Sequence, residues 1–588
     1  MPKRILGFTA LILAGCGGPA STSKPTPTAP GVSAKAAIIT GTPKIGPQWR
    51  MAGRATTVAG HEAMVVTGHP LASEVGTAIL KQGGNAIDAA VAVAFALTAV
   101  LPDAGNIGGG GFIVYRDSAG HVATLDYRET APTGASRNMY LDARGEPDDR
   151  SVTGHLSAGV PGSVAGLYAA WKRFGHLPWA TLVAPGVALA REHQVDQSRS
   201  HSIAGDSDRL VRFPASRQQF LPGGRPPQPG TAFRQPDLAR TLQLIADSGP
   251  GVFYKGQIAA QIVAEMHRGG GLISAKDLAT YEAKWRTPIA LHYRGYTIYS
   301  MPPASSGGVT MGEMLNIMEG YDTLPAFGSA GLLHLEAEAM RRAFMDRNRY
   351  LGDPDFVEMP LERLLSKSYA AQLRRAINPN KATPTPNFEA GAPGGAAHTT
   401  HYSIVDAHGN AASVTTTLNN SFGSAVTVTG AGFLLNDEMD DFATAPGKPN
   451  MYGLVQGEAN AIAPGKRMLS AMTPCIVLDP AGRLFLVLGA PGGPRIITAV
   501  YHVIVDVIDH GMPLADAVAA PRLHHQALPD TIFLEHGGVL PAVIDSLRQM
   551  GYGIHEWGYH ALVEAIERGP NGWIGVADPR SAGAARGY

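Results

Sequence analysis

Cysteine is nearly absent from this chain of 588 residues, which holds only Cys16 and Cys475. Two cysteines cannot build a disulfide framework, and they cannot supply a zinc site made mainly of thiolates. Cys16 lies near the start of the chain, whereas Cys475 lies in a stretch that predicts a β-strand. Because no partner is evident for Cys475, we expect it to be an inert, buried thiol.

A surplus of charge of either sign is also missing. The 48 Lys and Arg residues balance the 48 Asp and Glu residues, so the formal net charge is zero. No basic excess is available to neutralise phosphates, which argues against a nucleic acid as partner. Charged residues make up 16% of the chain and hydrophobic residues 45%, a balance that excludes bulk disorder and allows a large buried core.

The apolar run near the start of the chain is too short to span a bilayer as a mature helix. Two basic residues precede this run, residues 5–14, which ends just before Cys16. Residues 1–16 therefore predict an export signal whose end resembles a bacterial lipobox, with Cys16 as the lipidated residue. An ordinary cleaved export signal is the alternative, and both place the protein in the periplasm or on a membrane through a lipid anchor. Residues 17–50, rich in Ser, Thr, Pro, Gly and Ala, predict a flexible tether.

Helical and alternating patterns of hydrophobic residues follow one another along the rest of the chain, which indicates a layered α/β architecture. Helices are predicted at residues 71–82, 86–101, 164–174, 179–192, 309–318, 332–350, 495–510 and 540–550. Strands are predicted at residues 64–67, 112–115, 400–406, 411–419, 425–429, 473–478 and 484–488. A further strand, after the one at 112–115, is predicted to end at residues 126–129. Residues 378–397 have no periodicity and several Pro, Gly and Ala, which is typical of an exposed, mobile segment where a chain is cut.

The strands at 400–406 and 411–419 are predicted to form a hairpin whose turn centres near His408. In this register Thr399 lies opposite residues 417 and 418, so Thr417 is its expected cross-strand neighbour. Thr is a good strand residue, which alone would explain both positions. Cleavage of the His398–Thr399 bond would instead give Thr399 a free α-amine with a pKa near 8, able to accept the proton of its own hydroxyl.

Other motifs are interpreted as structural. Three residues apart on a strand, His398 and His401 point to opposite faces, so they cannot easily share a metal ion. The glycines at 108–111 lack the Lys-Ser/Thr and the strand–loop–helix order of a phosphate loop and predict a backbone turn. His524 and its neighbour are expected to pack or donate hydrogen bonds, and no G-x-S-x-G elbow is present.

Several ordered stretches are similar to the motifs of one known family. They are GGNAIDAA at 83–90, GNIGGGGF at 105–112, DYRE at 126–129, YLGDP at 350–354, TTHYS at 399–403, NDEMDDF at 436–442, PGG at 491–493 and APRLHH at 520–525. On these motifs the chain resembles the γ-glutamyltransferases of the N-terminal nucleophile hydrolase superfamily, from about Met64 to Tyr588.

The resemblance implies a four-layer αββα sandwich formed by a precursor that cleaves itself between His398 and Thr399. It implies a large subunit, residues 51–398, and a small catalytic subunit, residues 399–588, that stay associated. The implied activity is glutathione hydrolysis and transfer of γ-glutamyl groups to water, amino acids or peptides, without metal or cofactor. Glutathione and other γ-glutamyl compounds are the implied partners.

The resemblance also implies a role for individual residues. Thr399 is the nucleophile, Thr417 orients its amine, and Arg128 and Asp441 take the α-carboxylate and α-ammonium of the donor. The remaining implied residues are Asn419, Glu438 and Ser470 as polar contacts and Gly492 and Gly493 as the oxyanion hole. The family usually has two adjacent serines where this chain has Ser470 and Ala471, so one hydroxyl contact to the donor is expected to be missing.

Residues 446–453 resemble a loop that closes over the pocket, with Tyr452 at the closing position. A lid would hold water off the acyl-enzyme and favour transfer to an amine, whereas the alternative is a surface loop without consequence. Two other functions stay open. A related acylase would hydrolyse glutaryl-type amides, and an inactive, lipid-tethered protein would only bind amino acids.

Overall fold

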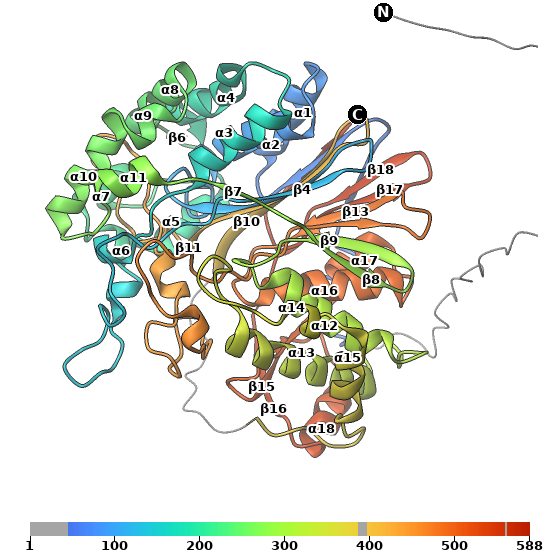
Figure 1. The fold of residues 1–588 in the computed structure, drawn as a ribbon. Coiled ribbons are helices and arrows are strands. Elements are labelled where there is room, and N and C mark those ends of the chain that lie inside the picture. The colour runs from blue at the N-terminus through green and yellow to red at the C-terminus, as the bar shows by residue number, and fades with distance from the viewer. Residues whose placement is uncertain (1–44, 386–396, 559–560) are drawn as a thin grey trace, which may run out of the picture. The chain divides into compact units, whose positions relative to one another are not determined.

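Two seven-stranded β-sheets form the centre of the molecule (Figure 1). The computed structural model describes residues 45–385, 397–558 and 561–588. The first sheet has the order β19 (Ala584–Gly587), β2 (Met64–Thr67), β10 (Ala397–Val405), β11 (Ala411–Asn420), β3 (Gly110–Arg116), β4 (Val122–Asp126) and β7 (Lys284–Arg286). The second has the order β1 (Thr57–Gly60), β18 (Gly572–Val576), β17 (Glu564–Gly569), β13 (Leu484–Gly489), β12 (Cys475–Leu478), β9 (Tyr296–Ser300) and β8 (Ile289–Tyr293).

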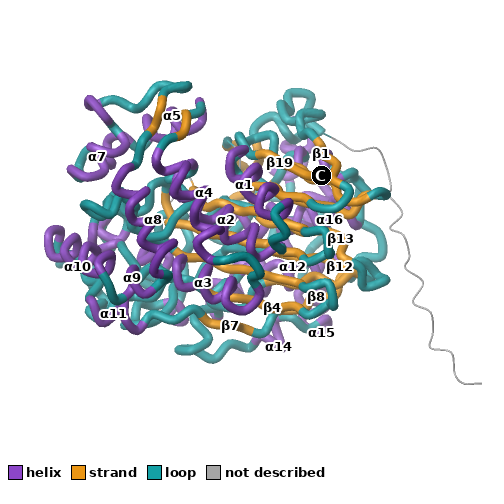
Figure 2. The backbone as a smooth tube through the Cα atoms, turned by 90° about the horizontal axis from the view of Figure 1, so that it is seen from above, coloured by secondary structure: helices purple, strands orange, loops and turns teal. Residues whose placement is uncertain are grey.

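The two sheets pack face to face and each carries a layer of helices on its other side. Strand β10 contacts β13 and β17 across the interface between the sheets. Figure 2 looks onto the helices that cover the first sheet. They are α1 (Pro70–Lys81), α2 (Ala86–Val100), α3 (Ser163–Phe174), α4 (Trp179–Arg191) and α8 (Pro236–Ser248). The layer on the second sheet holds α12 (Gly307–Glu319), α13 (Ala330–Tyr350), α16 (Arg495–Ile508) and α17 (Leu514–Ala519). The predicted four-layer αββα sandwich is confirmed.

Shorter elements surround these layers. The remaining helices are α5 (Gln197–Gly205), α6 (Ser207–Leu210), α7 (Pro214–Phe220), α9 (Gly251–Tyr254), α10 (Gln257–Gly269), α11 (Ala275–Thr280), α14 (Leu361–Leu364), α15 (Lys367–Arg375) and α18 (Pro541–Gln549). The remaining strands are β5 (His193–Gln194), β6 (Ala232–Phe233), β14 (Leu523–His524), β15 (Thr531–Glu535) and β16 (Gly553–Trp557). Among the described residues, no helix combines the length and the apolar character that crossing a membrane requires.

Helix α2 shows how local sequence and tertiary burial combine. The Asn85 side chain accepts hydrogen bonds from the backbone N–H of Ile87 and Asp88, and the Asp88 carboxylate accepts from the Asn85 N–H. This capping box satisfies donors that the first turn of a helix leaves without partners. All residues of α2 are buried, because α1, α4 and the first sheet enclose it.

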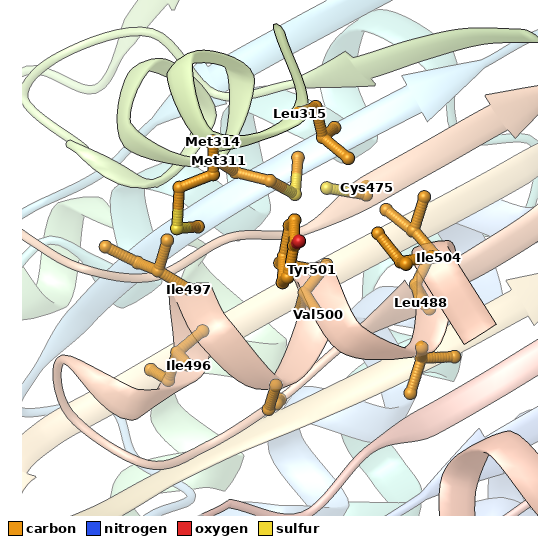
Figure 3. Close-up of a cluster of buried hydrophobic side chains, with 14 of the residues drawn as sticks. Met311, Met314, Leu315, Cys475, Leu488, Ile496, Ile497, Val500, Tyr501 and Ile504 are labelled. Carbon is orange, nitrogen blue, oxygen red and sulfur yellow. The ribbon is translucent and has the colours of Figure 1, made fainter. Parts of the chain in front are cut away.

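An apolar cluster joins the second sheet to its helices (Figure 3). Met311, Met314 and Leu315 of α12 meet Leu488 of β13 and the α16 residues Ile496, Ile497, Val500, Tyr501 and Ile504. Cys475 lies in this cluster with no accessible surface, and burial raises the pKa of its thiol to about 12. The prediction of a buried, unpaired cysteine is confirmed.

Three predictions about local structure need correction. Residues 425–429 form only an isolated bridge between Thr427 and Leu434 and not a strand, because Ala425 has a left-handed φ of 63° and the N–H of Thr427 donates to Ser216. Strand β4 ends at Asp126, three residues earlier than predicted. Within the segment expected to be exposed, Thr385 is buried and its N–H donates to Asp530 at 2.8 Å. Residues 386–396 of that segment lie outside the described residues.

Both sheets draw strands from both sides of Thr399. Strands β2, β3, β4 and β7 precede it in the first sheet, and β11 and β19 follow it. The second sheet combines β1, β8 and β9 with β12, β13, β17 and β18. A cut before Thr399 would therefore leave two pieces held together by shared backbone hydrogen bonds and one core.

Candidate active site

The hairpin of β10 and β11 positions two hydroxyl groups against each other. Thr399 pairs with Thr417 in the sheet register, as the sequence predicted. The Thr399 hydroxyl donates to the Thr417 hydroxyl oxygen at 3.0 Å, and both residues are buried. The backbone N–H of Asn419 donates to the same Thr417 oxygen at 2.8 Å, which fixes its orientation.

Glycines allow a neighbouring strand to approach Thr417 closely. Residues 110 and 111 begin β3, which pairs with β11, and a Cβ atom on Gly109 would lie 2.1 Å from the carbonyl oxygen of Thr417. The Asn106 side chain donates to that same carbonyl oxygen at 2.9 Å and accepts from the Gly109 N–H. The glycine run is thus partly a turn, as predicted, and partly a close backbone contact that supports the hydroxyl pair.

Asn419, one residue before the end of β11, has a left-handed conformation with φ of 81°. Its side chain donates to the carbonyl oxygen of Asp437 at 3.1 Å, and its own carbonyl oxygen accepts from the Tyr452 hydroxyl at 3.0 Å. Asn tolerates this backbone conformation better than most residues, and such strain often marks functional positions.

A buried arginine lies beside three carboxyl groups. Arg128 follows β4, is 1% exposed, and its guanidinium lies 2.6 Å from a Glu438 oxygen. It also donates to Asp441 and to the neighbouring Glu129. Asp441 and Glu438 lie about 310 positions from Arg128 in the sequence, so only the fold brings them to it.

The carboxyl groups around Arg128 titrate abnormally. Burial raises the pKa of Glu129 to about 7, although Arg128 acts in the opposite direction. Burial also raises the pKa of Glu438 and of Asp441 against the same attraction. Arg128 contacts all three of these buried carboxyl groups and does not fully offset the cost of burying them, which favours their protonated forms. An ammonium group bound beside these carboxyl groups would stabilise their ionised forms, and the resulting carboxylates would bind the ammonium group.

Two glycines form the connection from β13 to α16. Gly492 has a φ of 148° and Gly493 a φ of 58°, values that side chains rarely permit. Gly493 lines the same pocket as Thr399, and Gly492 precedes it outside the wall. Ser470 and Ala471 lie on another part of that wall, where the Ser470 hydroxyl oxygen accepts from the Met472 N–H at 3.0 Å.

One small pocket, with a cavity volume of about 20 Å³, gathers most of the predicted residues. Its walls are Arg128, Arg347, Thr399, Thr417, Asn419, Asp441, Tyr452, Leu454, Leu469, Ser470, Ala471, Met472, Gly493, Pro494 and Ile496. Glu438 lies behind Arg128 and is not part of the wall. Sequence reasoning missed Arg347, because an arginine near the end of a helix carries no signal of its own.

Residues 446–453 lie next to this pocket and are tied to its walls. The N–H of Met451 donates to the Asp440 carboxylate at 3.1 Å, and the Tyr452 hydroxyl donates to the backbone of Asn419. Tyr452 is 3% exposed and lines the pocket. The segment is therefore a fixed part of the site in this structure and not a free surface loop.

Thr399 also lines a second cavity, of about 580 Å³. Polar residues on its walls include His69, Asp196, Arg199 and Glu564. The threonine hydroxyl thus lies between a small charged pocket and a larger space.

Two of the histidines singled out in the sequence, His401 and His524, are buried and hydrogen-bonded. His401 is fully buried and contacts the hydroxyls of Thr415 and Ser403, and burial lowers its pKa to about 3. His524 contacts Thr498 and Gln526, as a packed and hydrogen-bonded histidine would. The described residues contain no group of three or more His, Cys, Asp or Glu side chains suited to a metal ion. Cys16 and the His398 side chain lie outside the described residues.

Comparison with known proteins places this geometry in context. A family model described as gamma-glutamyltranspeptidase matches residues 72–588. The chain is 45% identical to a glutathione hydrolase proenzyme of Escherichia coli, and the matched region covers 89% of this chain and 91% of that protein. It is 42% identical to an acylase ACY 1 proenzyme of a Pseudomonas species, covering 79% of this chain and 83% of that protein.

Solved structures agree with these matches. The cephalosporin acylase from Bacillus halodurans superposes with a TM-score of 0.80 at 28% identity and covers 91% of this chain and 97% of that chain. Helicobacter pylori gamma-glutamyltranspeptidase superposes with a TM-score of 0.53 at 44% identity, over 54% of this chain and 92% of that chain. The αββα sandwich is thus the N-terminal nucleophile hydrolase fold, and the chain belongs to the gamma-glutamyltranspeptidase family.

Proposed function

We propose that this protein is a glutathione hydrolase and γ-glutamyltransferase that uses Thr399 as an N-terminal nucleophile. One observation carries the proposal. The Thr399 hydroxyl lies 3.0 Å from that of Thr417, in a pocket that also holds Arg128 and Asp441. An attacking group and a pair of opposite charges in one small pocket suit an acyl donor that ends in an amino-acid head.

The first step is hydrolysis of the peptide bond between His398 and Thr399. It consumes one water and releases a carboxyl group on residue 398 and an α-amine on Thr399. An α-amine has a pKa near 8, so a useful fraction is neutral at physiological pH and able to take the hydroxyl proton. Thr417, held by the Asn419 N–H, is the hydroxyl that orients this amine.

In turnover, the Thr399 oxygen attacks the γ-amide carbonyl of the donor, and the amine carries the proton to the leaving nitrogen. An ester forms on Thr399 and cysteinylglycine leaves when glutathione is the donor. Water or an acceptor amine then attacks the ester and restores the hydroxyl. Backbone N–H groups at Gly492 and Gly493 stabilise the oxyanion, a contribution of about 3 kcal/mol per donor in comparable sites.

The donor's head group is recognised by charge. Arg128 offers a planar fork to the α-carboxylate, and Asp441 offers a counter-charge to the α-ammonium. Asn419, Glu438 and Ser470 complete the polar surroundings. The cavity of about 580 Å³ on which Thr399 also borders offers room for the leaving dipeptide and the acceptor.

The proposal extends to processing and location. Cleavage gives a large subunit that ends at His398 and a small subunit that begins at Thr399, and the strands of both subunits in both sheets keep them associated. Residues 1–16 direct export and Cys16 is the lipidation site. The loop at 446–453, closed by Tyr452, shields the acyl-enzyme from water and favours transfer to amines or peptides.

An acylase acting on glutaryl-type amides is the competing function, and the 42% identical acylase supports it. A glutaryl group has no ammonium, so it would offer Asp441 no counter-charge beyond that of Arg128. Comparing kcat/KM for γ-glutamyl-p-nitroanilide and glutaryl-p-nitroanilide decides between the two. We expect the γ-glutamyl donor to be preferred, and preference for the glutaryl donor would overturn the proposal. A purified protein that stays in one piece and turns over neither would instead be a binding protein.

A further inference from the structure

A second arginine lines the small pocket and has a different environment from Arg128. Arg347 comes from the last turn of α13 and is 1% exposed. Its guanidinium donates to the hydroxyl oxygen of Ser306 at 3.0 Å, to Asn348 at 2.9 Å and to Gln456 at 3.3 Å. Within the described part of the chain, every hydrogen-bond acceptor it reaches is a neutral oxygen.

The charge of Arg347 is therefore balanced only at a distance. Arg128 contacts the carboxylates of Glu438 and Asp441 directly, whereas Arg347 is attracted to Asp441 without an ion pair. Burial lowers the pKa of Arg347 to about 10, so it still carries its charge at neutral pH. A buried cation held only by neutral groups is costly unless an anion joins it.

Arg347 and Ser470 both line the small pocket and are linked through Ser306. Ser306, which accepts from Arg347, donates both its N–H and its hydroxyl to the carbonyl oxygen of Ser470, at 2.8 and 2.6 Å. Next to Ser470, the side chain of Ala471 offers no hydrogen bond to a ligand in the pocket. A carboxylate bound at this wall, which can accept up to four hydrogen bonds, would find the Ser470 hydroxyl and Arg347 as donors.

We infer that Arg347 binds the α-carboxylate of the donor, as a second cation beside Arg128. This inference rests on the proposed function, since it concerns the same pocket. It makes Arg347 a specificity-determining residue that selects donors with a carboxylate on the α-carbon. It also explains how the pocket holds an anion although Arg128 is already engaged by two carboxylates.

The test compares three small ligands that differ by one charged group. L-glutamate carries both head-group charges, glutarate lacks the ammonium, and 4-aminobutyrate lacks the α-carboxylate. Their affinities for the purified, full-length protein are measured by ligand-observed NMR titration, which needs no turnover. We expect Arg347→Met to weaken the binding of L-glutamate and of glutarate by about 10- to 100-fold, the range of a lost charge-assisted contact. The binding of 4-aminobutyrate should weaken by less than about twofold.

Two further variants separate binding from folding. Arg347→Lys keeps the charge without the planar fork and should recover part of the L-glutamate affinity. Arg349→Met removes an exposed arginine from the same helix and should change nothing. If Arg347→Met weakens the binding of all three ligands equally, Arg347 has a structural role. If it weakens only the binding of L-glutamate and 4-aminobutyrate, it acts through Asp441.

Either result overturns the inference, as does a wild-type protein that binds 4-aminobutyrate but neither L-glutamate nor glutarate. Failure of the proposed function is recognised separately, because it shows as absent release of nitroaniline from γ-glutamyl-p-nitroanilide. The affinities would still report on Arg347 in that case.

Discussion

The small pocket around Thr399 and the apolar cluster between α12 and α16 are both lined mainly by buried side chains, but the pocket is polar and charged whereas the cluster is apolar. The cluster joins side chains such as Met311, Leu488 and Ile504, whose burial stabilises the fold. The pocket buries Arg128 and three carboxyl groups whose pKa values burial raises. The apolar cluster therefore stabilises the fold enough to offset the cost of the buried charges in the pocket, which remain available to bind a ligand.

The largest expected effect is loss of chemistry at the pocket. Thr399→Ala removes the hydroxyl, so we expect a single uncleaved chain on denaturing gels and at least about a 1,000-fold loss of turnover. Thr399→Ser keeps a hydroxyl and should keep cleavage and measurable activity. Cleavage before residue 399 in the alanine variant, found by N-terminal sequencing, would contradict the mechanism.

Removing one charge from the pocket should change recognition. Asp441→Asn leaves the α-ammonium without its counter-charge, and we expect KM for γ-glutamyl-p-nitroanilide to rise about 10- to 100-fold. The matched control is Glu458→Gln, which removes an exposed carboxylate. An unchanged KM for Asp441→Asn would show that the ammonium binds elsewhere.

A cavity in the apolar cluster should lower the stability of the protein and leave its activity nearly unchanged. Leu488→Ala removes buried methyl groups and is expected to lower the free energy of unfolding by about 2–5 kcal/mol. Urea unfolding measures the loss, and kcat/KM at a temperature where the variant stays folded should lie within about twofold of wild type. A large fall in kcat/KM would mean that the two regions are coupled.

The pH dependence of stability tests the cost of buried charge. Burial raises the pKa of Asp440 from 3.8 to about 6, so the folded protein binds more protons than the unfolded chain between these values. The free energy of unfolding should therefore fall as pH rises from about 4 to 6, by on the order of 1–3 kcal/mol from this group. Asp440→Asn removes the titration and should flatten that slope in urea melts recorded across this range. An unchanged slope would assign the cost to other groups.

The smallest effect concerns the position where the chain departs from its relatives' usual pattern. Ala471→Ser restores a hydroxyl on the pocket wall and is expected to tighten donor binding by about 1 kcal/mol, or about fivefold in KM. The Ala471→Gly variant adds no donor and serves as control. A KM that rises in the serine variant would show that the wall is already filled.

The hairpin could be predicted in register because its determinants are local. The Asp406 carboxylate accepts from the N–H groups of His408 and Asn410, and Gly409 takes the left-handed φ of 79° that the turn needs. This turn sets Thr399 opposite Thr417 before any other part of the fold is considered. The prediction of a strand at 425–429 failed because this segment forms only an isolated bridge between Thr427 and Leu434, and the Thr427 N–H donates to Ser216, which lies far away in the sequence.

The amino-acid sequence by itself determined the hairpin, the helix caps and the motifs that identify the family, because these depend on neighbours within a few turns of chain. Only the tertiary structure decided which charges meet. The contact of Arg128 with Asp441 and the place of Arg347 on the pocket wall join segments from different layers. Buried electrostatics depends on distances across the whole fold, and no local pattern records those distances.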